Sequence, residues 1–304
     1  MSIEVKNVTK NFGPIRVLNN VNLRIDSGEL VALLGPSGCG KTSLLRIIAG
    51  LETADFGSIY LEDDDATLTG ARERQVGFVF QHYALFRHMS VFENVAFGLR
   101  VKPKKERPSE DKIREKVHEL LDMVQLKFLK DRFPSQLSGG QRQRIGIARA
   151  IALKPRFIVA DEPVSALDVS IQAQVINLLD DLKAEEKISM VFIAHDLSVV
   201  QHISDRVAVM YLGKIMELAP TADLYAKPHH PYTTALLSAV PLPDPRSERT
   251  RERIILQGDL PSPMNPPSGC VFRTRCWKAQ SKCETEVPTL KNHGSLATAC
   301  HFPE

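Results

Sequence analysis

A glycine-rich stretch at residues 35–43 has the residue types that bind phosphate. Glycines let the backbone curl so that several N–H groups point at phosphate oxygens, and a following helix adds its positive N-terminus. Lys41 would place its charge against the β- and γ-phosphates of a nucleotide, and the Thr42 hydroxyl would reach Mg²⁺. Cys39 fits as a small tolerated residue, or as a reactive thiol if the helix N-terminus lowers its pKa. The predicted nucleotide-binding residues here are Gly35, Pro36, Ser37, Gly38, Cys39, Gly40, Lys41, Thr42 and Ser43.

Two carboxylates follow an apolar run much later in the chain. Residues 157–160 are all apolar, and Asp161 and Glu162 come directly after them. Asp161 could hold Mg²⁺ through water, and Glu162 could reach toward the γ-phosphate and polarise an attacking water. Taken alone, the two acids could also be a solvated pair at a strand end. The phosphate-binding stretch favours the catalytic interpretation.

A third motif, LSGGQ, has the features of a second anion site. Its members are Leu137, Ser138, Gly139, Gly140 and Gln141. A helix is expected from Gln141, so two glycines stand at its positively polarised end. The Ser138 hydroxyl could donate a hydrogen bond to a γ-phosphate oxygen. The motif lies too far along the chain to belong to the same phosphate cradle as Lys41.

The elements that would position these motifs alternate between strands and helices. Leu30–Leu34 is continuously apolar, as in a strand covered on both faces, and it leads through the glycine loop into a helical pattern. Further apolar strands are expected at 76–80, 157–160 and 190–194, and apolar residues at helical spacing predict a helix at about 110–127. The sequence therefore predicts an α/β fold with a mostly parallel sheet, flanking helices and a helical insert at about residues 87–155.

The composition is that of an ordinary globular protein. The chain has 304 residues, of which 43% are hydrophobic and 25% charged, with a net charge of +3. So small a charge gives no reason to expect a nucleic-acid partner, and the short basic stretch 102–107 is typical of a solvated loop. No stretch approaches the roughly 20 apolar residues that cross a bilayer, and the N-terminus has no secretory hydrophobic core. We expect a cytoplasmic protein that serves a membrane only through a partner.

Together the glycine loop, LSGGQ and the Asp161–Glu162 pair resemble the ATP-binding cassette (ABC) ATPases, the motor subunits of membrane transporters. The resemblance covers roughly residues 1–225 and implies ATP and Mg²⁺ as ligands. It also implies that the LSGGQ motif of one protomer caps the ATP held by the other.

Four further residues match positions of this family. The resemblance implies that Phe12 stacks on adenine, that Gln81 touches Mg²⁺ and the membrane subunit, and that His195 contacts the γ-phosphate. Asp168 ends the loop 165–168 that matches the connection between the two sites. Singly, Phe12 could be a core residue, Gln81 a surface amide and His195 a satisfied core histidine. Their order and spacing favour the family roles, with Glu162, His195 and Gln81 as the catalytic residues.

The composition changes near residue 228, where prolines become dense. They are Pro228, Pro231, Pro241, Pro243, Pro245, Pro261, Pro263, Pro266 and Pro267. Such density argues against regular helix or sheet. We therefore expect a nucleotide-binding domain at residues 1–227 and a small irregular C-terminal domain at 228–304.

Four of the five cysteines lie in the last 35 residues, at Cys270, Cys276, Cys283 and Cys300. In a reducing compartment this pattern favours a metal over disulfides, although the spacing is not the tight pair of a zinc ribbon. Residues 230–233 and 256–276 resemble the tail of oligopeptide and dipeptide importer ATPases. In that family the four cysteines are associated with a [4Fe–4S] cluster; zinc and no metal remain alternatives. A cluster confined to the tail would leave nucleotide binding largely independent of it.

The two halves of the chain resemble different importers. Residues 78–99 resemble the ATPases of sulfate/thiosulfate importers, whereas the chain from about Ile145 onward resembles the peptide class. Peptide importer ATPases usually have Asp-Pro after the glutamine, where this chain has His82 and Tyr83. The sulfate class normally ends in a β-rich regulatory domain, which this chain lacks. The sequence is thus a mosaic, natural or artificial.

The resemblance implies an ATPase that drives import, peripheral on the cytoplasmic face of the membrane. The tail favours oligopeptides or dipeptides as the transported solute, with sulfate/thiosulfate as the alternative. The implied partners are a second ABC ATPase subunit, transmembrane permease subunits and, indirectly, an extracytoplasmic substrate-binding protein. A soluble ABC protein acting on ribosomes or DNA is less favoured, because such proteins usually carry two cassettes in one chain. A P-loop kinase or GTPase is disfavoured by LSGGQ and His195.

Overall fold

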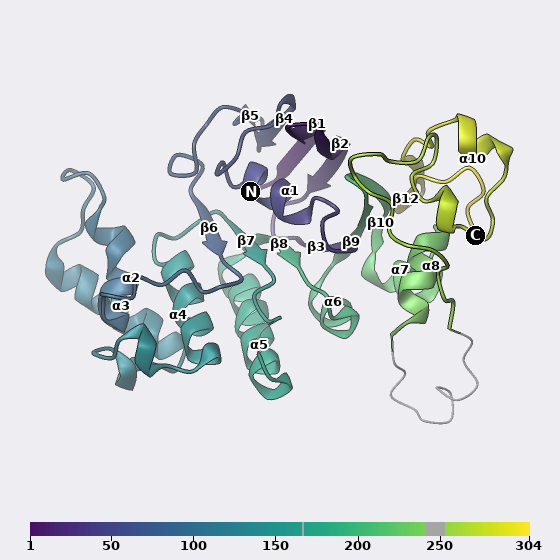
Figure 1. Cartoon of the computed structure of the whole chain (residues 1–304). Helices are drawn as coiled ribbons and strands as arrows, with labels where there is room; N and C mark the ends of the chain where they lie inside the picture. Colours follow the sequence, from purple (N-terminus) through teal and green to yellow (C-terminus); the bar gives the residue numbers. More distant parts are fainter. Residues whose placement is uncertain (166, 241–252) are drawn as a thin grey trace.

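The computed structural model describes residues 1–165, 167–240 and 253–304, and its centre is a large twisted sheet (Figure 1). Among these residues the strand order of this sheet is β11-β12-β10-β9-β3-β8-β7-β6. The pairings among β9, β3, β8, β7 and β6 are parallel, and those of β10, β12 and β11 are antiparallel. The strands are β3 (Leu30–Leu34), β6 (Val76–Val79), β7 (Phe157–Asp161), β8 (Ser189–Ile193), β9 (Arg206–Tyr211), β10 (Lys214–Pro220), β11 (Lys291–His293) and β12 (Leu296–Thr298). The predicted mostly parallel α/β sheet is confirmed.

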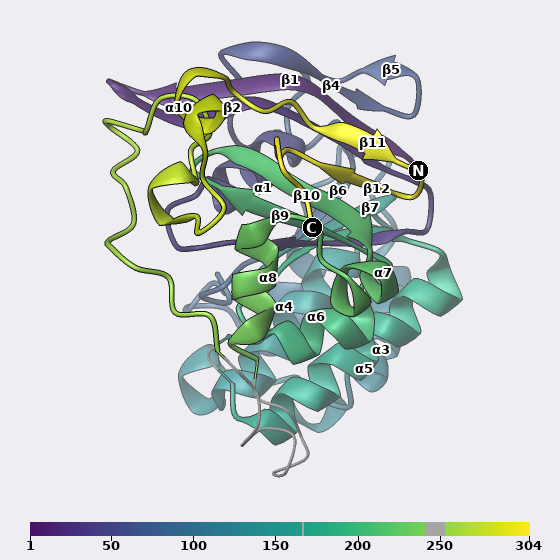
Figure 2. The ribbon, with the colours of Figure 1, turned by 90° about the vertical axis from the view of Figure 1, so that its right-hand side faces the viewer.

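A smaller antiparallel sheet and one helix cover one face of the large sheet. In the described chain its order is β2-β1-β4-β5, from β1 (Ile3–Phe12), β2 (Ile15–Ile25), β4 (Phe56–Leu61) and β5 (Asp64–Asp65). Helix α1 (Lys41–Ile48) packs its buried Leu44, Leu45 and Ile48 into the core between the two sheets. Figure 2 shows this layering, with the small sheet on one side of the large sheet and most helices on the other.

The opposite face is covered by helices that share a second core. These are α2 (Val91–Arg100), α3 (Glu110–Met123), α4 (Gly139–Ile151), α5 (Val169–Glu186) and α6 (Leu197–Ile203), with 3₁₀ turns η1 (Lys127–Leu129) and η2 (Pro134–Gln136). The apolar residues whose spacing predicted a helix from residue 110 are all buried, namely Ile113, Val117, Leu120, Leu121 and Val124. A capping box with Ser90 and Glu93 starts α2, so the helical insert has its own start signal.

The tail has more regular structure than its proline content suggests. It contains α8 (Pro231–Ser238), η3 (Arg273–Arg275) and α10 (Ser281–Thr285), besides β11 and β12, and α7 (Thr221–Ala226) directly precedes it. Pro231 occupies the first turn of α8, where a missing N–H costs nothing. Strand β12 pairs with β10, so the tail extends the large sheet instead of standing apart from it. Of the predicted proline cluster, Pro241, Pro243 and Pro245 lie outside the described residues.

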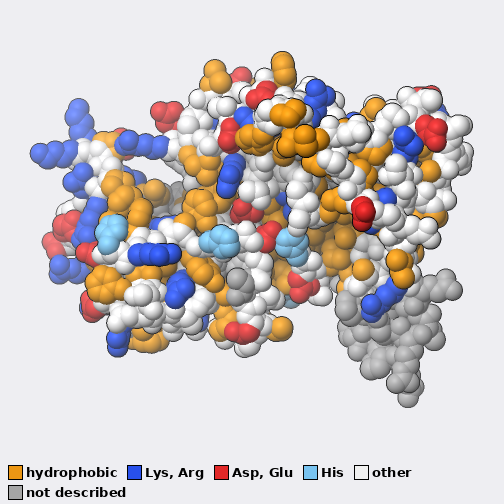
Figure 3. Space-filling model, in the orientation of Figure 1, with side chains coloured by type: hydrophobic (Ala, Val, Ile, Leu, Met, Phe, Trp, Pro, Cys, Tyr) orange, Lys and Arg blue, Asp and Glu red, His pale blue; other side chains and the backbone are white. Residues whose placement is uncertain are grey.

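The surface carries no single dominant charged face in the view of Figure 3, although Lys and Arg side chains gather at the end of the molecule near α2 and α3. The basic stretch 102–107 lies there, in the exposed connection between these two helices. No helix in the described ranges is long and apolar enough to cross a membrane.

Candidate nucleotide site

The predicted phosphate loop connects the end of β3 to the start of α1. Gly35, Gly38 and Gly40 all have positive φ angles, of 147°, 78° and 101°. A Cβ atom at Gly35 would overlap the Met210 carbonyl oxygen, and one at Gly40 would come within 2.5 Å of the Val17 carbonyl oxygen. The loop can therefore follow this path only with glycine at both positions.

Lys41 lies across this loop. Its Nζ donates hydrogen bonds to the carbonyl oxygens of Gly35 (2.8 Å) and Pro36 (3.0 Å), and its side chain is buried. The ammonium group is thus held at the mouth of the cradle formed by the loop and the N-terminus of α1. A phosphate placed there would meet backbone N–H groups, the helix dipole and one full positive charge.

Asp161 and Thr42 meet beside the loop. Asp161 ends strand β7, and its Oδ1 accepts a hydrogen bond from the Thr42 hydroxyl at 3.1 Å. Burial raises the pKa of the Asp161 carboxyl, while the bond from Thr42 acts against this. A hard cation would favour the ionised form, and a hydroxyl beside a carboxylate is a ligand set that suits Mg²⁺.

Glu162 brings Gln81 and His195 together. Its Oε2 accepts a hydrogen bond from Gln81 Nε2 at 2.6 Å, and its Oε1 lies 2.6 Å from His195 Nε2. Gln81 follows β6 and His195 follows β8, on either side of β7 in the sheet, so the parallel strands deliver all three side chains to one edge. This is an acid held between an amide and an imidazole, an arrangement suited to orienting and deprotonating a water.

A cavity of about 320 Å³ collects most of the predicted nucleotide residues. Its lining is Phe12, Val17, Ser37, Gly38, Gly40, Lys41, Thr42, Ser43, Glu162 and His195. Phe12, at the end of β1, is 45% exposed, so its ring is not a core residue and is available for stacking. Val17 is the one lining residue that is not among the predicted site residues.

The LSGGQ motif does not contribute to this cavity. Ser138 caps α4, where its Oγ accepts a hydrogen bond from Gln141 N (3.3 Å) and Gln141 Oε1 accepts one from Ser138 N (2.9 Å). Gly139 and Gly140 form the first turn of α4 and face Tyr83 and Ile171, leaving no room for a side chain. The LSGGQ motif therefore forms the N-terminus of α4, apart from the cavity at the phosphate loop of its own chain.

Asp168 has a local structural role. It caps α5, with Oδ1 accepting a hydrogen bond from Ile171 N at 3.0 Å. Ser165, three residues after Glu162, donates its hydroxyl to the Glu162 carbonyl oxygen at 3.2 Å. The loop that includes Asp168 is thus hydrogen-bonded to the end of β7 at Glu162. Ala166, in the same loop, lies outside the described residues.

Cys39 is buried within the phosphate loop, at 1% exposure. Burial raises the pKa of its thiol, and the nearby Lys41 charge only partly opposes this. The expectation of a reactive thiol with a lowered pKa is therefore wrong, because desolvation outweighs the helix N-terminus. The structure supports the simpler interpretation of a small packed residue.

The tail lies against the back of the phosphate loop. A cavity of about 540 Å³ is lined by Gly35, Pro36 and Ser37 of the loop and by tail residues from α8 and from the segment with Ile254, Leu256 and Arg275. Phe272 is fully buried between Tyr211 and Tyr232, with ring centroids 5.4 and 5.3 Å away. Ser37 and His195 line both this cavity and the nucleotide cavity, so the tail lies close to the nucleotide site.

The four tail cysteines are neighbours but do not form a ready metal site. Cys270 N donates a hydrogen bond to the Cys283 carbonyl oxygen at 2.8 Å. Burial, with a contribution from the charges of the other three thiols, raises the pKa of Cys270 to about 11. In the part of the chain that the structure describes, no three His, Cys, Asp or Glu side chains are gathered so that they could hold a metal ion. In this arrangement the thiols do not fit a cluster or zinc.

Two protein families match different parts of the chain. Residues 18–165 match the ABC transporter family, and residues 216–283 match the family described as oligopeptide/dipeptide transporter, C-terminal region. The second match includes Cys270, Cys276 and Cys283. The chain thus joins an ABC transporter match to a C-terminal match of the oligopeptide/dipeptide class, which is consistent with the predicted composite.

Curated relatives agree with the first match. A sulfate/thiosulfate import ATP-binding protein of Cucumis sativus is 55% identical over 240 residues, covering 79% of this chain and 69% of the relative. One of Pseudomonas syringae pv. tomato is 56% identical over 232 residues, covering 76% of this chain and 71% of the relative.

Solved structures agree on the fold. A dimeric ATP-binding cassette in a post-hydrolysis state, bound to ADP and Pi, is 34% identical with a TM-score of 0.66, covering 72% of this chain and 98% of that one. A nucleotide-free cassette from an ABC transporter is 29% identical with a TM-score of 0.66, covering 72% and 92%. The glycine loop with Lys41, the contact of Asp161 with Thr42, and the contacts of Glu162 with Gln81 and His195 thus occur in a chain with close ABC relatives. The chain belongs to the ABC transporter family, as an ATP-binding, ATP-hydrolysing subunit.

Proposed function

We propose that this chain pairs with a second ABC ATPase subunit, identical or different, and that two ATP molecules bind between the two subunits. The phosphate loop of one subunit and Ser138–Gln141 of the other would form each complete site. Two observations support this proposal. The chain's own nucleotide cavity is lined by residues of the loop and none of the LSGGQ motif, and a solved relative with ADP and Pi is dimeric.

The proposed chemistry is attack of a water on the γ-phosphate, which breaks the bond to the β-phosphate, so that ADP leaves and inorganic phosphate forms. Lys41 and the loop N–H groups bind the phosphates, and Phe12 stacks on the base. Thr42 and Asp161, with Gln81, would hold Mg²⁺, which neutralises charge on the β- and γ-phosphates when bound. Glu162 accepts the proton of the attacking water while His195 keeps its carboxylate in place. The contact of Glu162 with both Gln81 and His195 is the observation that carries this proposal.

We further propose that this hydrolysis drives import through transmembrane permease subunits. The chain would be peripheral on the cytoplasmic face, and an extracytoplasmic substrate-binding protein would deliver the solute. The sequence of the tail favours peptides as the solute, but the comparisons support the sulfate/thiosulfate alternative better. Relatives of that class match 228 residues or more at 53% identity or above, whereas the peptide-class match is confined to residues 216–283.

Complementation would decide between the two solutes. The chain is expressed in bacteria that lack their own sulfate-import ATPase, and in bacteria that lack their own peptide-import ATPase. Growth on sulfate as sole sulfur source, lost with Glu162→Gln, is the expected result. Growth only in the peptide strain would reverse the assignment. Copurification of permease subunits from membranes would test the association with the membrane, and recovery of the chain alone would count against it.

A metal in the tail remains a separate proposal. Four cysteines in one short segment, with Cys270 hydrogen-bonded to the Cys283 backbone, support a [4Fe–4S] cluster, with zinc as the alternative. Because the thiols as arranged do not form such a site, the tail would have to close around the metal. Anaerobic purification followed by absorption spectra and iron, sulfide and zinc analysis is the test. A colourless protein without stoichiometric metal would reject the proposal.

A further inference from the structure

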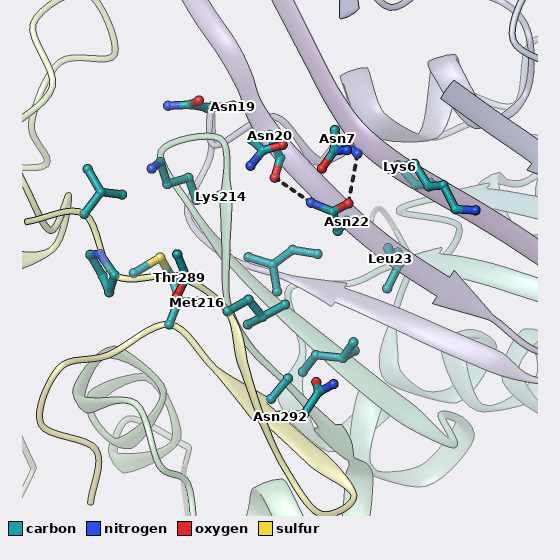
Figure 4. Close-up of a pocket in the computed structure, with 18 of the residues that line it drawn as sticks. Lys6, Asn7, Asn19, Asn20, Asn22, Leu23, Lys214, Met216, Thr289 and Asn292 are labelled. Atoms are coloured by element: carbon teal, nitrogen blue, oxygen red, sulfur yellow. Dashed lines mark hydrogen bonds between the residues drawn. The ribbon is translucent and has the colours of Figure 1, made fainter. Parts of the chain in front are cut away.

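A large cavity lies between the N-terminal strands and the C-terminal tail (Figure 4). Its volume is about 680 Å³, within the range of about 300–1,000 Å³ typical of small-molecule sites. Its walls come from β1, β2, β10 and the tail at 287–299. It shares no lining residue with the nucleotide cavity, so nothing in the ATPase assignment accounts for it.

The cavity combines an apolar floor with a polar rim. The floor includes Ile215, Met216 and Val271, while five asparagines stand around it. Asn22 is already engaged, since its Oδ1 accepts from Asn7 N (2.9 Å) and its Nδ2 donates to the Asn20 carbonyl oxygen (3.1 Å) (Figure 4). The Asn19 side chain has no hydrogen-bond partner among the described residues, and its backbone N–H donates to the carbonyl oxygen of Gly213, the residue before Lys214, at 2.9 Å. Asn19 and Lys214 both line the cavity (Figure 4).

The charges around the cavity leave one cation uncompensated. Four cations and one acid line it, and three of the cations have an acidic neighbour: Lys6 with Glu4 (2.9 Å), Arg24 with Asp26 (3.0 Å) and Arg206 with Glu29 (3.2 Å). Lys214 has no acidic partner in the described chain. It is only partly exposed, and burial lowers the pKa of its ammonium group. A half-buried cation without a counter-ion is costly unless an anion joins it.

A second cation approaches the same point from an adjoining cavity of about 380 Å³. Asn19 and Lys214 line both cavities, so they stand at the junction. Arg16 lines the second cavity, and within the described residues its side chain has only a 3.4 Å hydrogen bond to Asn11 Oδ1. Burial lowers the pKa of Lys214, the nearby Cys270 thiol acts to raise it, and the charge of Arg16 lowers it, so the two cations repel each other across this junction.

We propose that Lys214, Arg16 and Asn19 form a binding site for the oxyanion of a small organic molecule, whose apolar body lies on the floor of the larger cavity. The oxyanion neutralises both cations and accepts hydrogen bonds from them and from the Asn19 amide. Charge-assisted bonds of this kind are among the strongest in proteins, and partial burial strengthens them further. The floor at Ile215, Met216 and Val271 excludes water from the rest of the ligand.

The site connects two parts of the chain that are distant in sequence. Arg16 and Asn19 belong to β2, whose pairing partner β1 ends at Phe12 of the nucleotide cavity, and Lys214 belongs to β10, on which the tail hairpin is built. A ligand at this junction would fasten the hairpin that carries Phe12 to β10 and the tail beside it. By linkage, its affinity would then depend on what the tail and the nucleotide cavity contain.

The proposal is tested by calorimetric titration of the purified full chain. Saturating ADP and Mg²⁺ keep oxyanions out of the phosphate loop. The probes are N-acetyl-leucine, which joins a carboxylate to an apolar body, its uncharged amide, and inorganic sulfate. We expect saturable binding of N-acetyl-leucine, weaker binding of sulfate, and no measurable binding of the amide. Absence of saturable binding, or equal binding of the amide, would overturn the site; a response to sulfate alone would overturn its assignment to an organic anion.

Variants locate the site. Lys214→Met and Arg16→Met should each weaken N-acetyl-leucine binding by at least about tenfold, the loss expected for one charge-assisted bond. Lys6→Met is the matched control, because Lys6 lines the same cavity but is paired with Glu4. It should leave the affinity unchanged. Each variant must first show wild-type ADP binding, and if Lys214→Met fails to fold, Arg16→Met carries the test. Unchanged affinity in a folded Lys214 or Arg16 variant would contradict the proposal.

Discussion

Replacing Glu162 by Gln removes the proposed base while keeping its size. At present one carboxylate oxygen faces His195 Nε2 and the other accepts from Gln81 Nε2, each at 2.6 Å. An amide has only one accepting oxygen, so one of the two neighbours loses its acceptor and meets an N–H₂ group instead. Lys41, Thr42 and the glycine loop are unchanged in this variant. The affinity for ATP should therefore stay within about threefold of wild type, a smaller change than the loss of one hydrogen bond would cause.

The expected loss of turnover follows from the role of the base. Removing a positioned general base costs about 10²–10⁴-fold in rate, which corresponds to about 2.7–5.4 kcal/mol of barrier at about 1.36 kcal/mol per tenfold. Because Glu162 and His195 are in direct contact, their losses should not multiply. The double variant Glu162→Gln with His195→Ala should be about as slow as Glu162→Gln alone.

Phosphate release at saturating ATP measures turnover, and titration with a fluorescent ATP analogue measures binding in the same samples. Near-normal phosphate release by Glu162→Gln would refute the base assignment. A double variant whose loss is the product of the two single losses would refute the view that Glu162 and His195 act as one unit. Loss of ATP binding in Glu162→Gln would show that the substitution had disturbed the loop itself.

Three further predictions concern the support of the site. His230 is buried, and burial lowers its pKa to about 3. The unfolded chain, in which this imidazole has its ordinary pKa, therefore takes up a proton below about pH 6.5. As the pH drops from 6.5 toward 3, the free energy of unfolding should fall by up to about 1.4 kcal/mol per pH unit. Urea titrations at several pH values should show that this pH dependence is absent from His230→Asn, which retains a capping side chain. Equal pH dependence of the free energy of unfolding in the variant and the wild type would contradict the role of His230. Gly35→Ala should lower the melting temperature more than Gly38→Ala, because only the first Cβ meets the Met210 carbonyl; equal melting temperatures would count against the loop geometry. Phe272→Ala should destabilise the chain by about 3–5 kcal/mol and raise KM for ATP. An unchanged KM in folded protein would show that nucleotide binding does not depend on the packing of the tail.

Much of the site could be predicted because its chemistry is carried by local motifs. The phosphate loop needs a strand, a glycine turn and a helix in immediate succession, and Leu30–Leu34 and α1 supply them. Glu162 and His195 each follow a continuously apolar strand, and parallel strands end at one edge of a sheet. Their 2.6 Å contact nevertheless needed the fold, because no spacing along the chain specifies it.

What the sequence missed depends on contacts between distant segments. Val17 lines the nucleotide cavity and lies beside Gly40. Its backbone carbonyl oxygen leaves no room for a Cβ atom at Gly40, and this contact does not depend on the type of side chain at position 17. The proline content of the tail concealed its pairing with β10, because strand pairing is not visible in composition. Cys39 illustrates the same limit in electrostatics: its place before a helix favours a lowered pKa, but its burial, known only from the fold, raises it.

The shared site between two subunits is the central claim, and dimers of mixed composition test it most directly. In one preparation a subunit with Lys41→Ala is paired with a subunit with Ser138→Arg; in the other, one subunit carries both substitutions and its partner neither. Differently tagged chains isolate each mixed dimer, and Glu162→Gln in every chain allows ATP trapping to be counted without hydrolysis.

If each site is built from Lys41 of one subunit and Ser138 of the other, the first preparation keeps one intact site and traps ATP, at about half the level of the unsubstituted dimer. The second preparation keeps none and traps no ATP. The opposite pattern, with trapping only in the second preparation, would show that each chain completes its own site and would contradict the account.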